Sequence, residues 1–172
     1  MTAPSDDGPS DTAAAKARSI VRLVLDEKSF LRRRPEVEHE REVAIFDLLE
    51  ENMFRLSGDG VHPGPYHVHL RLAEDRLQFD IRDTDDQAVR EIVVAVRPFR
   101  MVIKDYFIVC ESYFDAIKTS SPSQIEAIDM GRRALHNEGA EMLLERLRAE
   151  ADLDHTTARR LFTLLCVLHM RG

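Results

Sequence analysis

Three histidines and one aspartate near the middle of the chain are the residues best suited to metal chemistry. They are His62, His67, His69 and Asp80. His67 and His69 share one side of an alternating segment, and imidazole nitrogens with a carboxylate can hold zinc or ferrous iron. Arg71 and Arg82 would occupy the same face and repel a cation, and an exposed sheet face normally carries polar residues. We therefore favour a solvated face over a metal site, and we expect no cofactor.

A second candidate is a polar face on the helix expected after residue 121. A rotation of about 100° per residue groups Asp129, Arg132, Arg133, His136 and Asn137. As a site for an anion or a partner, it would use Arg133 as a charged fork and His136 as a group that titrates near neutrality. The alternative is a routine surface ion pair between Asp129 and Arg133 at i,i+4, and this alternative is favoured.

A third candidate is the run of arginines at 32–34, which precedes Pro35 and could meet a phosphate at a helix start. Acidic residues in the next turn oppose this, so solvated ion pairs are favoured. Glu36 and His39 have the Glu-x-x-His spacing of di-iron bundles, but the sequence holds no second such pair. It also holds no Gly-x-Ser-x-Gly elbow and no glycine-rich phosphate loop. Whether the protein is an enzyme is left open.

Composition limits the class of protein that presents these residues. The 172 residues carry a net charge of −7, which disfavours nucleic-acid binding. Cys110 and Cys166 lie in apolar runs typical of buried, unreactive thiols, and no segment resembles a membrane helix. These features predict a cytoplasmic protein. Residues 1–17 contain no Leu, Ile, Val, Phe or Tyr and predict a disordered tail, and 18–172 predict a single domain.

Hydrophobic periodicity predicts the elements that position the candidate sites. We expect a strand at 20–25, a helix at 36–53, a loop at 57–65, a hairpin at 66–82 and a buried strand at 92–96. In the hairpin, a two-residue turn at Glu74 and Asp75 would place His69 opposite Asp80, although a longer turn would shift this register.

The rest of the chain predicts helices. An apolar stripe covers 99–117, and Ser121, Pro122 and Gln124 form a capping box that begins the next helix. That helix either continues to 150 or breaks at Gly139, and the two alternatives are equally compatible with the sequence. Asp154 caps a last helix that ends near residue 172.

Strands grouped before helices predict the fold class. We expect an α+β fold in which a small antiparallel sheet of three to four strands packs against four to five helices. Small residues on the helix after 121, Ala127, Gly131 and Ala134, would allow close packing and are compatible with a homodimer.

Four segments resemble a bacterial family known as Uncharacterised Protein Family 0262. They are VEHEREVAIFDLLEEN at 37–52, FRMVIKDYFIVCESYFDAIK at 99–118, SPSQIEAIDMGRRALHNEGAEML at 121–143 and ARRLFTLLCVLHMRG at 158–172. The resemblance covers about residues 20–172. It implies a single domain and a cytoplasmic setting, and it transfers no catalytic or binding role to any position.

Two classes of function remain open. The favoured one is a cytosolic, non-catalytic interaction or regulatory protein that uses the polar face from Asp129 to Asn137 to meet a protein partner. The alternative is a small enzyme or ligand-binding protein with a pocket between the sheet edge and the helices, where His136, Arg133 or the paired histidines act as polar anchors.

Overall fold

The computed structural model describes residues 19–26 and 35–170. The predicted tail at 1–17 and the arginines at 32–34 lie outside these residues. The elements in chain order are β1 (Ile20–Asp26), α2 (Pro35–Glu50), β2 (Phe54–Leu56), β3 (Tyr66–Ala73), β4 (Arg76–Arg82), β5 (Ala88–Ala95), η1 (Arg97–Phe99), α3 (Arg100–Thr119), α4 (Pro122–Leu147), β6 (Ala151–Leu153) and α5 (His155–His169). The α+β prediction is confirmed.

The hairpin of β3 and β4 forms with the register that the alternation predicted. Leu72 pairs with Leu77 and His69 pairs with Asp80. The two turn residues, Glu74 and Asp75, have φ angles of 52° and 58°, the left-handed pair of a type I′ turn. This turn matches the twist of the strands, so it holds the register even though it lacks the usual glycine.

The four-stranded sheet has the order β1-β3-β4-β5 and is mixed, not wholly antiparallel as expected. β1 pairs with β3 in parallel. A parallel pair needs a long crossover connection, and the segment that contains α2 provides it. Asn52, after α2, fixes this crossover: its side chain accepts a hydrogen bond from the Ile20 amide at 2.7 Å and donates one to the Ile20 carbonyl at 2.8 Å.

Two short strands were missing from the prediction. β2 and β6 pair antiparallel, with Phe54 opposite Leu153. Each has three residues, so neither is long enough to show an alternating pattern.

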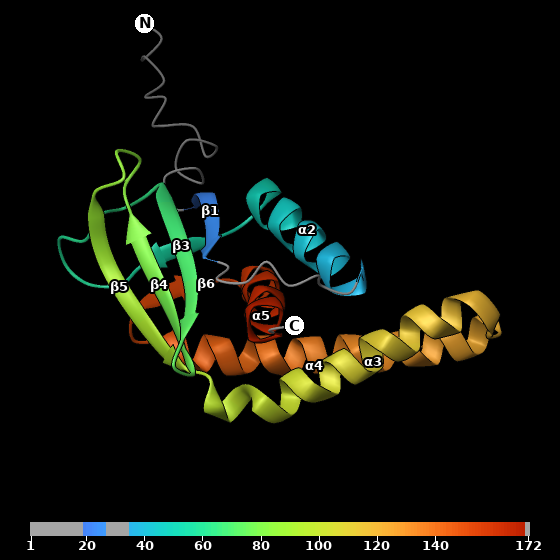
Figure 1. Cartoon of the computed structure of the whole chain (residues 1–172). Coiled ribbons are helices and arrows are strands. Elements are labelled where there is room, and N and C mark those ends of the chain that lie inside the picture. Colours follow the sequence, from blue (N-terminus) through green and yellow to red (C-terminus); the bar gives the residue numbers. More distant parts are fainter. Residues whose placement is uncertain (1–18, 27–34, 171–172) are drawn as a thin grey trace, which may run out of the picture.

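The helices begin where their capping residues predicted. The Ser121 hydroxyl accepts a hydrogen bond from the Gln124 amide, and the Gln124 side chain accepts one from the Ser121 amide. Asp154 caps α5 by accepting from the Thr157 amide at 2.9 Å. α3 and α4 form a long antiparallel hairpin that projects beyond the sheet (Figure 1). None of the described helices is long and apolar enough to cross a membrane.

α4 is continuous through Gly139, which therefore has a packing role and does not end the helix. A Cβ atom at this position would lie 2.4 Å from the ring of Phe162 on α5. The glycine lets two helices approach each other closely. α5 lies at the centre of the helical layer, and every residue from Leu161 to Leu168 is buried. The inner sheet face and the helices share this core.

Candidate functional site

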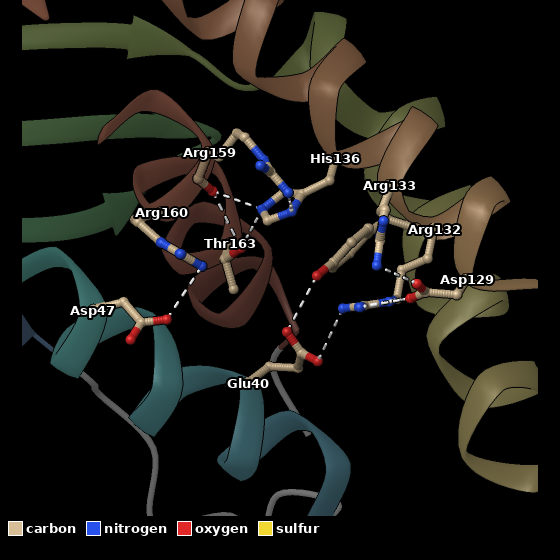
Figure 2. Close-up of polar contacts among 10 residues, drawn as sticks. Glu40, Asp47, Asp129, Arg132, Arg133, His136, Arg159, Arg160 and Thr163 are labelled. Carbon is tan, nitrogen blue, oxygen red and sulfur yellow. Dashed lines mark hydrogen bonds and ion pairs between the residues drawn. The ribbon is translucent and has the colours of Figure 1, made fainter. Parts of the chain in front are cut away.

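A polar cavity of about 430 Å³ lies where α2, α3, α4 and α5 meet. Its polar lining includes Glu40, Arg132, His136, Arg159, Arg160 and Thr163. These residues come from three helices, and Figure 2 shows their side chains directed toward a common centre. Polar groups from separate helices converge here beside the main core, as in many ligand sites.

His136 is held as a neutral hydrogen-bonding group in the wall of this cavity. Its Nε2 atom lies 2.8 Å from the Arg159 carbonyl and 2.7 Å from Oγ1 of Thr163. A carbonyl only accepts, so Nε2 carries the proton and Nδ1 has a free lone pair. Burial lowers the pKa of His136 to about 4. The expectation that this histidine titrates near neutrality is therefore wrong.

Arg159 differs from the neighbouring arginines in its partners. One Nη2 hydrogen is directed at Nδ1 of His136, with 3.5 Å between the nitrogens, and the buried Nε has no hydrogen-bond partner. Within the described chain, no carboxylate lies within ion-pair distance of Arg159. Desolvation lowers its pKa, and the charges of Arg160 and Arg132 lower it further. The side chain is therefore a cation that the protein orients without neutralising it.

The other two cavity arginines have carboxylate partners. Arg160 lies 3.3 Å from Oδ2 of Asp47. Arg132 donates to Asp129 at 2.8 Å and lies 4.0 Å from Glu40. The hydrogen bond from Arg132 is the main cause of the lowered pKa of Asp129. These pairs make most of the cavity wall charge-balanced and leave Arg159 as the exception.

The rest of the cavity lining is largely apolar, apart from His39, which packs edge-on against Phe114. It contains Val43, Tyr113, Phe114 and Ile117 from α2 and α3. Val43 is 39% exposed and Ile117 is 50% exposed, so both can still be covered by a ligand. Arg132 lies 5.1 Å from the centre of the Tyr113 ring, which ties the polar and apolar walls together by a cation–π contact.

The helix face predicted as a site is divided by the structure. Asp129, Arg132 and His136 turn toward the neighbouring helices, whereas Arg133 is 66% exposed and pairs with Asp129 at 2.9 Å. Asn137 is exposed. The predicted ion pair between Asp129 and Arg133 is present, but the face to which it belongs is largely an internal one.

Sequence reasoning missed Arg159, Arg160 and Glu40. A signal for the first two was available, because two adjacent arginines interrupt the apolar residues of the last helix. Glu40 had no comparable signal, since it lies among other acidic residues of α2. The small-residue side of α4 faces away from the described chain: Ala127 and Ala134 are exposed, and a Cβ on Gly131 would meet nothing within 4 Å.

The hairpin histidines form a separate cluster on the outer sheet face. Nδ1 of His67 and Nε2 of His69 lie 3.9 and 3.7 Å from Oδ1 of Asp86. Asp80 instead pairs with Arg82 at 2.7 Å, and Arg82 also binds Asp86 at 3.0 Å.

His62 does not join this cluster. Its Nδ1 accepts a hydrogen bond from the Gly64 amide, and its ring packs against Tyr66. Among residues 19–26 and 35–170, no group of three or more potential ligands is arranged to hold a metal ion.

A larger cavity of about 980 Å³ lies between α2, α3 and the end of α5. Phe107 and Ile108 line it, as does Pro35, the first residue after the undescribed segment 27–34. We assign no ligand to it. Cys110, which also borders this cavity, and Cys166 are buried free thiols, as predicted, and burial raises the pKa of Cys110 to about 11.

Comparison with known proteins identifies the relatives of this chain. The family described as Uncharacterised protein family (UPF0262) matches residues 17–171. A relative from Rhodospirillum rubrum is 60% identical over 153 residues, covering 89% of this chain and 93% of the relative. Relatives from Paramagnetospirillum magneticum and Mesorhizobium japonicum are 54% and 53% identical, covering 90% and 95% of this chain and 98% of each relative. No solved structure matches the chain. The resemblance seen in the four sequence segments is thus confirmed, and the chain belongs to the bacterial family UPF0262.

Proposed function

We propose that this protein binds a small anionic ligand in the cavity between α2, α3, α4 and α5. The observation that carries the proposal is Arg159, a partly buried cation with no carboxylate partner among the described residues. A partly buried charge without a counter-charge costs the folded protein stability, and costs of this kind are typical of functional sites. An anion is the ligand class that would compensate it.

The charges around the cavity support an anionic ligand. Three arginines, at positions 132, 159 and 160, line the cavity together with one carboxylate, Glu40. Arg132 pairs with Asp129 and Glu40, and Arg160 pairs with Asp47, so Arg159 is the lining arginine without a carboxylate partner among the described residues. Because Arg159 is partly buried, this charge attracts an anion more strongly than a fully exposed arginine does.

His136 supports the proposal by its protonation state. As a neutral acceptor it orients the Arg159 guanidinium, whereas a carboxylate in its place would cancel the positive charge. Thr163 in turn fixes the histidine by accepting from Nε2 at 2.7 Å. We assign Arg159 as the ligand-binding residue and His136 and Thr163 as residues that position it.

We further propose that the protein acts without catalysis, as a cytoplasmic single-domain regulatory protein that transmits ligand occupancy to a protein partner. The proposal of a protein partner is supported by Arg133 and Asn137. Both are exposed on α4, the helix that also places Arg132 and His136 at the cavity. Two buried free cysteines favour a reducing compartment, and one shared core favours a single domain.

Thermal denaturation and isothermal titration with inorganic phosphate and acetate, at matched ionic strength in chloride-free buffer, test the anion site. We expect both probes to stabilise the wild-type protein by mass action. Arg159→Met removes the charge and keeps most of the side-chain bulk, so it should abolish the stabilisation. Arg133→Met, which removes an exposed arginine outside the cavity lining, is the control and should respond like the wild type. Equal responses of all three proteins, or no response, would reject the anion site.

Cross-linking followed by mass spectrometry tests the partner. The regulatory role predicts one protein captured in stoichiometric amount by the wild type and lost with the double variant Arg133→Ala, Asn137→Ala. The same capture by the double variant would reject this surface.

A further inference from the structure

The identity of the ligand can be narrowed from the two walls of the cavity, and this step rests on the anion site proposed above. We infer that the ligand is a monocarboxylate with a compact apolar body: its carboxylate meets Arg159, and its apolar part covers Val43, Phe114 and Ile117.

Charge favours a single negative group. Arg159 is the one lining arginine without a carboxylate partner among the described residues, and Glu40 lines the same cavity with a side chain that is only 18% exposed. Its Oε2 accepts a hydrogen bond from Tyr106, and its Oε1 lies 4.0 Å from Arg132. A second negative charge on the ligand would face this carboxylate without a free cation to offset it. A phosphate dianion is therefore a poorer match than a carboxylate.

Hydrogen bonding favours a planar, two-oxygen group. Of the five N–H donors of the Arg159 guanidinium, only one Nη2 hydrogen has an acceptor in the described chain, namely Nδ1 of His136. Because His136 fixes one edge of the guanidinium plane, the orientation of the other Nη group is fixed too. A carboxylate can take two parallel hydrogen bonds from such a fork.

The apolar part of the cavity lining indicates that the ligand has an apolar part as well. Val43 and Ile117 are 39% and 50% exposed although they line the cavity, and Phe114 belongs to the same lining. A cavity of about 430 Å³ is near the small end of the roughly 300–1,000 Å³ range of ligand pockets, so the body must be compact. Covering this wall releases water from apolar surface, which contributes affinity that a bare anion such as acetate cannot gain.

A panel of four probes separates these features: phenylacetate, acetate, phenylacetamide and phenyl phosphate, titrated into the full chain by calorimetry. The expected order places phenylacetate at least about ten-fold tighter than each of the others. Acetate lacks the apolar body, phenylacetamide lacks the charge, and phenyl phosphate carries a second charge. Equal or tighter binding of any of these three would overturn the inference.

Two matched variants on α3 test the apolar wall. Ile117→Ala should weaken phenylacetate binding several-fold and leave acetate binding unchanged. Ile108→Ala is the control, because Ile108 is 52% exposed on the same helix but lines the other cavity. The same loss in both variants, or no loss in Ile117→Ala, would overturn the assignment of this wall.

Failure of this inference can be told apart from failure of the proposed function. If phosphate or acetate binds in a manner that depends on Arg159 and phenylacetate is no better, the anion site stands and the ligand class is wrong. If no probe binds, or if binding survives Arg159→Met, the anion site itself is wrong.

Discussion

Two clusters of histidine, arginine and aspartate occur in this protein, and the fold treats them differently. On the outer face of the hairpin, His67 and His69 lie near Asp86, and Arg82 is bound by two aspartates. Between the helices, His136 is buried and faces an arginine that has no carboxylate partner within residues 19–26 and 35–170. In the first cluster the arginine is paired with carboxylates, whereas in the second it has no carboxylate partner among the described residues.

The difference follows from what each element can shield from water. One face of the hairpin packs on the core, and its other face carries polar groups at the surface, where ion pairs form at little cost or gain. At the helix junction, side chains from three helices enclose the polar groups, so each missing partner matters more. The surroundings of a histidine, more than its spacing in the sequence, therefore decide which chemistry it can support.

The largest expected effect comes from breaking the helix contact that frames the cavity. Gly139→Ala places a methyl group 2.4 Å from the fully buried ring of Phe162, so we expect the free energy of unfolding to fall by about 3 kcal/mol. Urea denaturation measures it. Gly131→Ala on the same helix meets no atom within 4 Å and should be neutral or stabilising by up to about 1 kcal/mol. Equal effects would mean that α4 and α5 do not pack as described.

The next largest effect is the pH dependence that the buried His136 gives to the free energy of unfolding. The pKa of His136 falls from 6.5 to about 4 on folding, because burial disfavours the charged ring. Between these values the unfolded chain binds more protons than the folded one, so stability is full above pH 6.5 and decreases as the pH falls toward 4.

Between pH 7 and pH 5 this single group should remove about 2 kcal/mol from the free energy of unfolding. His136→Gln keeps a donor and an acceptor but does not titrate, so the variant should lose that part of the pH dependence. Urea unfolding of both proteins at the two pH values gives the comparison. Parallel pH profiles would show that His136 does not carry this effect.

A smaller effect, of opposite sign, is an increase in the free energy of unfolding when Arg159 is replaced. Arg159→Met should raise the free energy of unfolding by up to about 1 kcal/mol in the absence of ligand, because it removes a cation that is repelled by Arg160 and Arg132. Arg160→Met breaks the ion pair with Asp47 and should not stabilise the protein. Differential scanning calorimetry distinguishes them. Destabilisation by Arg159→Met would indicate that this arginine has a structural role.

The smallest effect is expected on the sheet face. Asp86 is 49% exposed and has a φ of 64°, a conformation that asparagine also tolerates. Asp86→Asn should therefore change the free energy of unfolding by less than about 0.5 kcal/mol, since it removes only surface ion pairs. Chemical denaturation at low and moderate salt checks this value. If the free energy of unfolding fell by more than about 1 kcal/mol, the polar contacts on the sheet face would matter as much as those between the helices, contrary to our expectation.

Much of the fold was predictable because local patterns encode it. The alternation in β3 and β4 fixed their pairing, and Ser121 and Asp154 marked the starts of α4 and α5 through hydrogen bonds made within a few residues. The parallel pairing of β1 was not predictable in this way, because it depends on how α2 crosses the sheet. Gly139 was ambiguous because glycine serves both helix ends and close helix contacts.

The candidate site was predictable only in part. Asp129, Arg132 and His136 were recognised as a group from their helical spacing, but the spacing does not reveal which neighbours cover them. Arg159 lies 23 residues after His136 and belongs to another helix. Its importance depends on a missing counter-charge, and the sequence, which is rich in acidic residues, gives no sign of that local deficit.

The sequence alone determined most of the helices and the longer strands, the hairpin register, the burial of both cysteines and the family, because these depend on local periodicity, capping and residue similarity. The tertiary structure decided which side of α4 faces inward and which cavity arginine has no carboxylate partner in the part of the chain that the structure describes. The physical reason is range: caps and alternation act between residues close in the chain, whereas the charge balance of a cavity depends on side chains that only the packing of separate helices brings together.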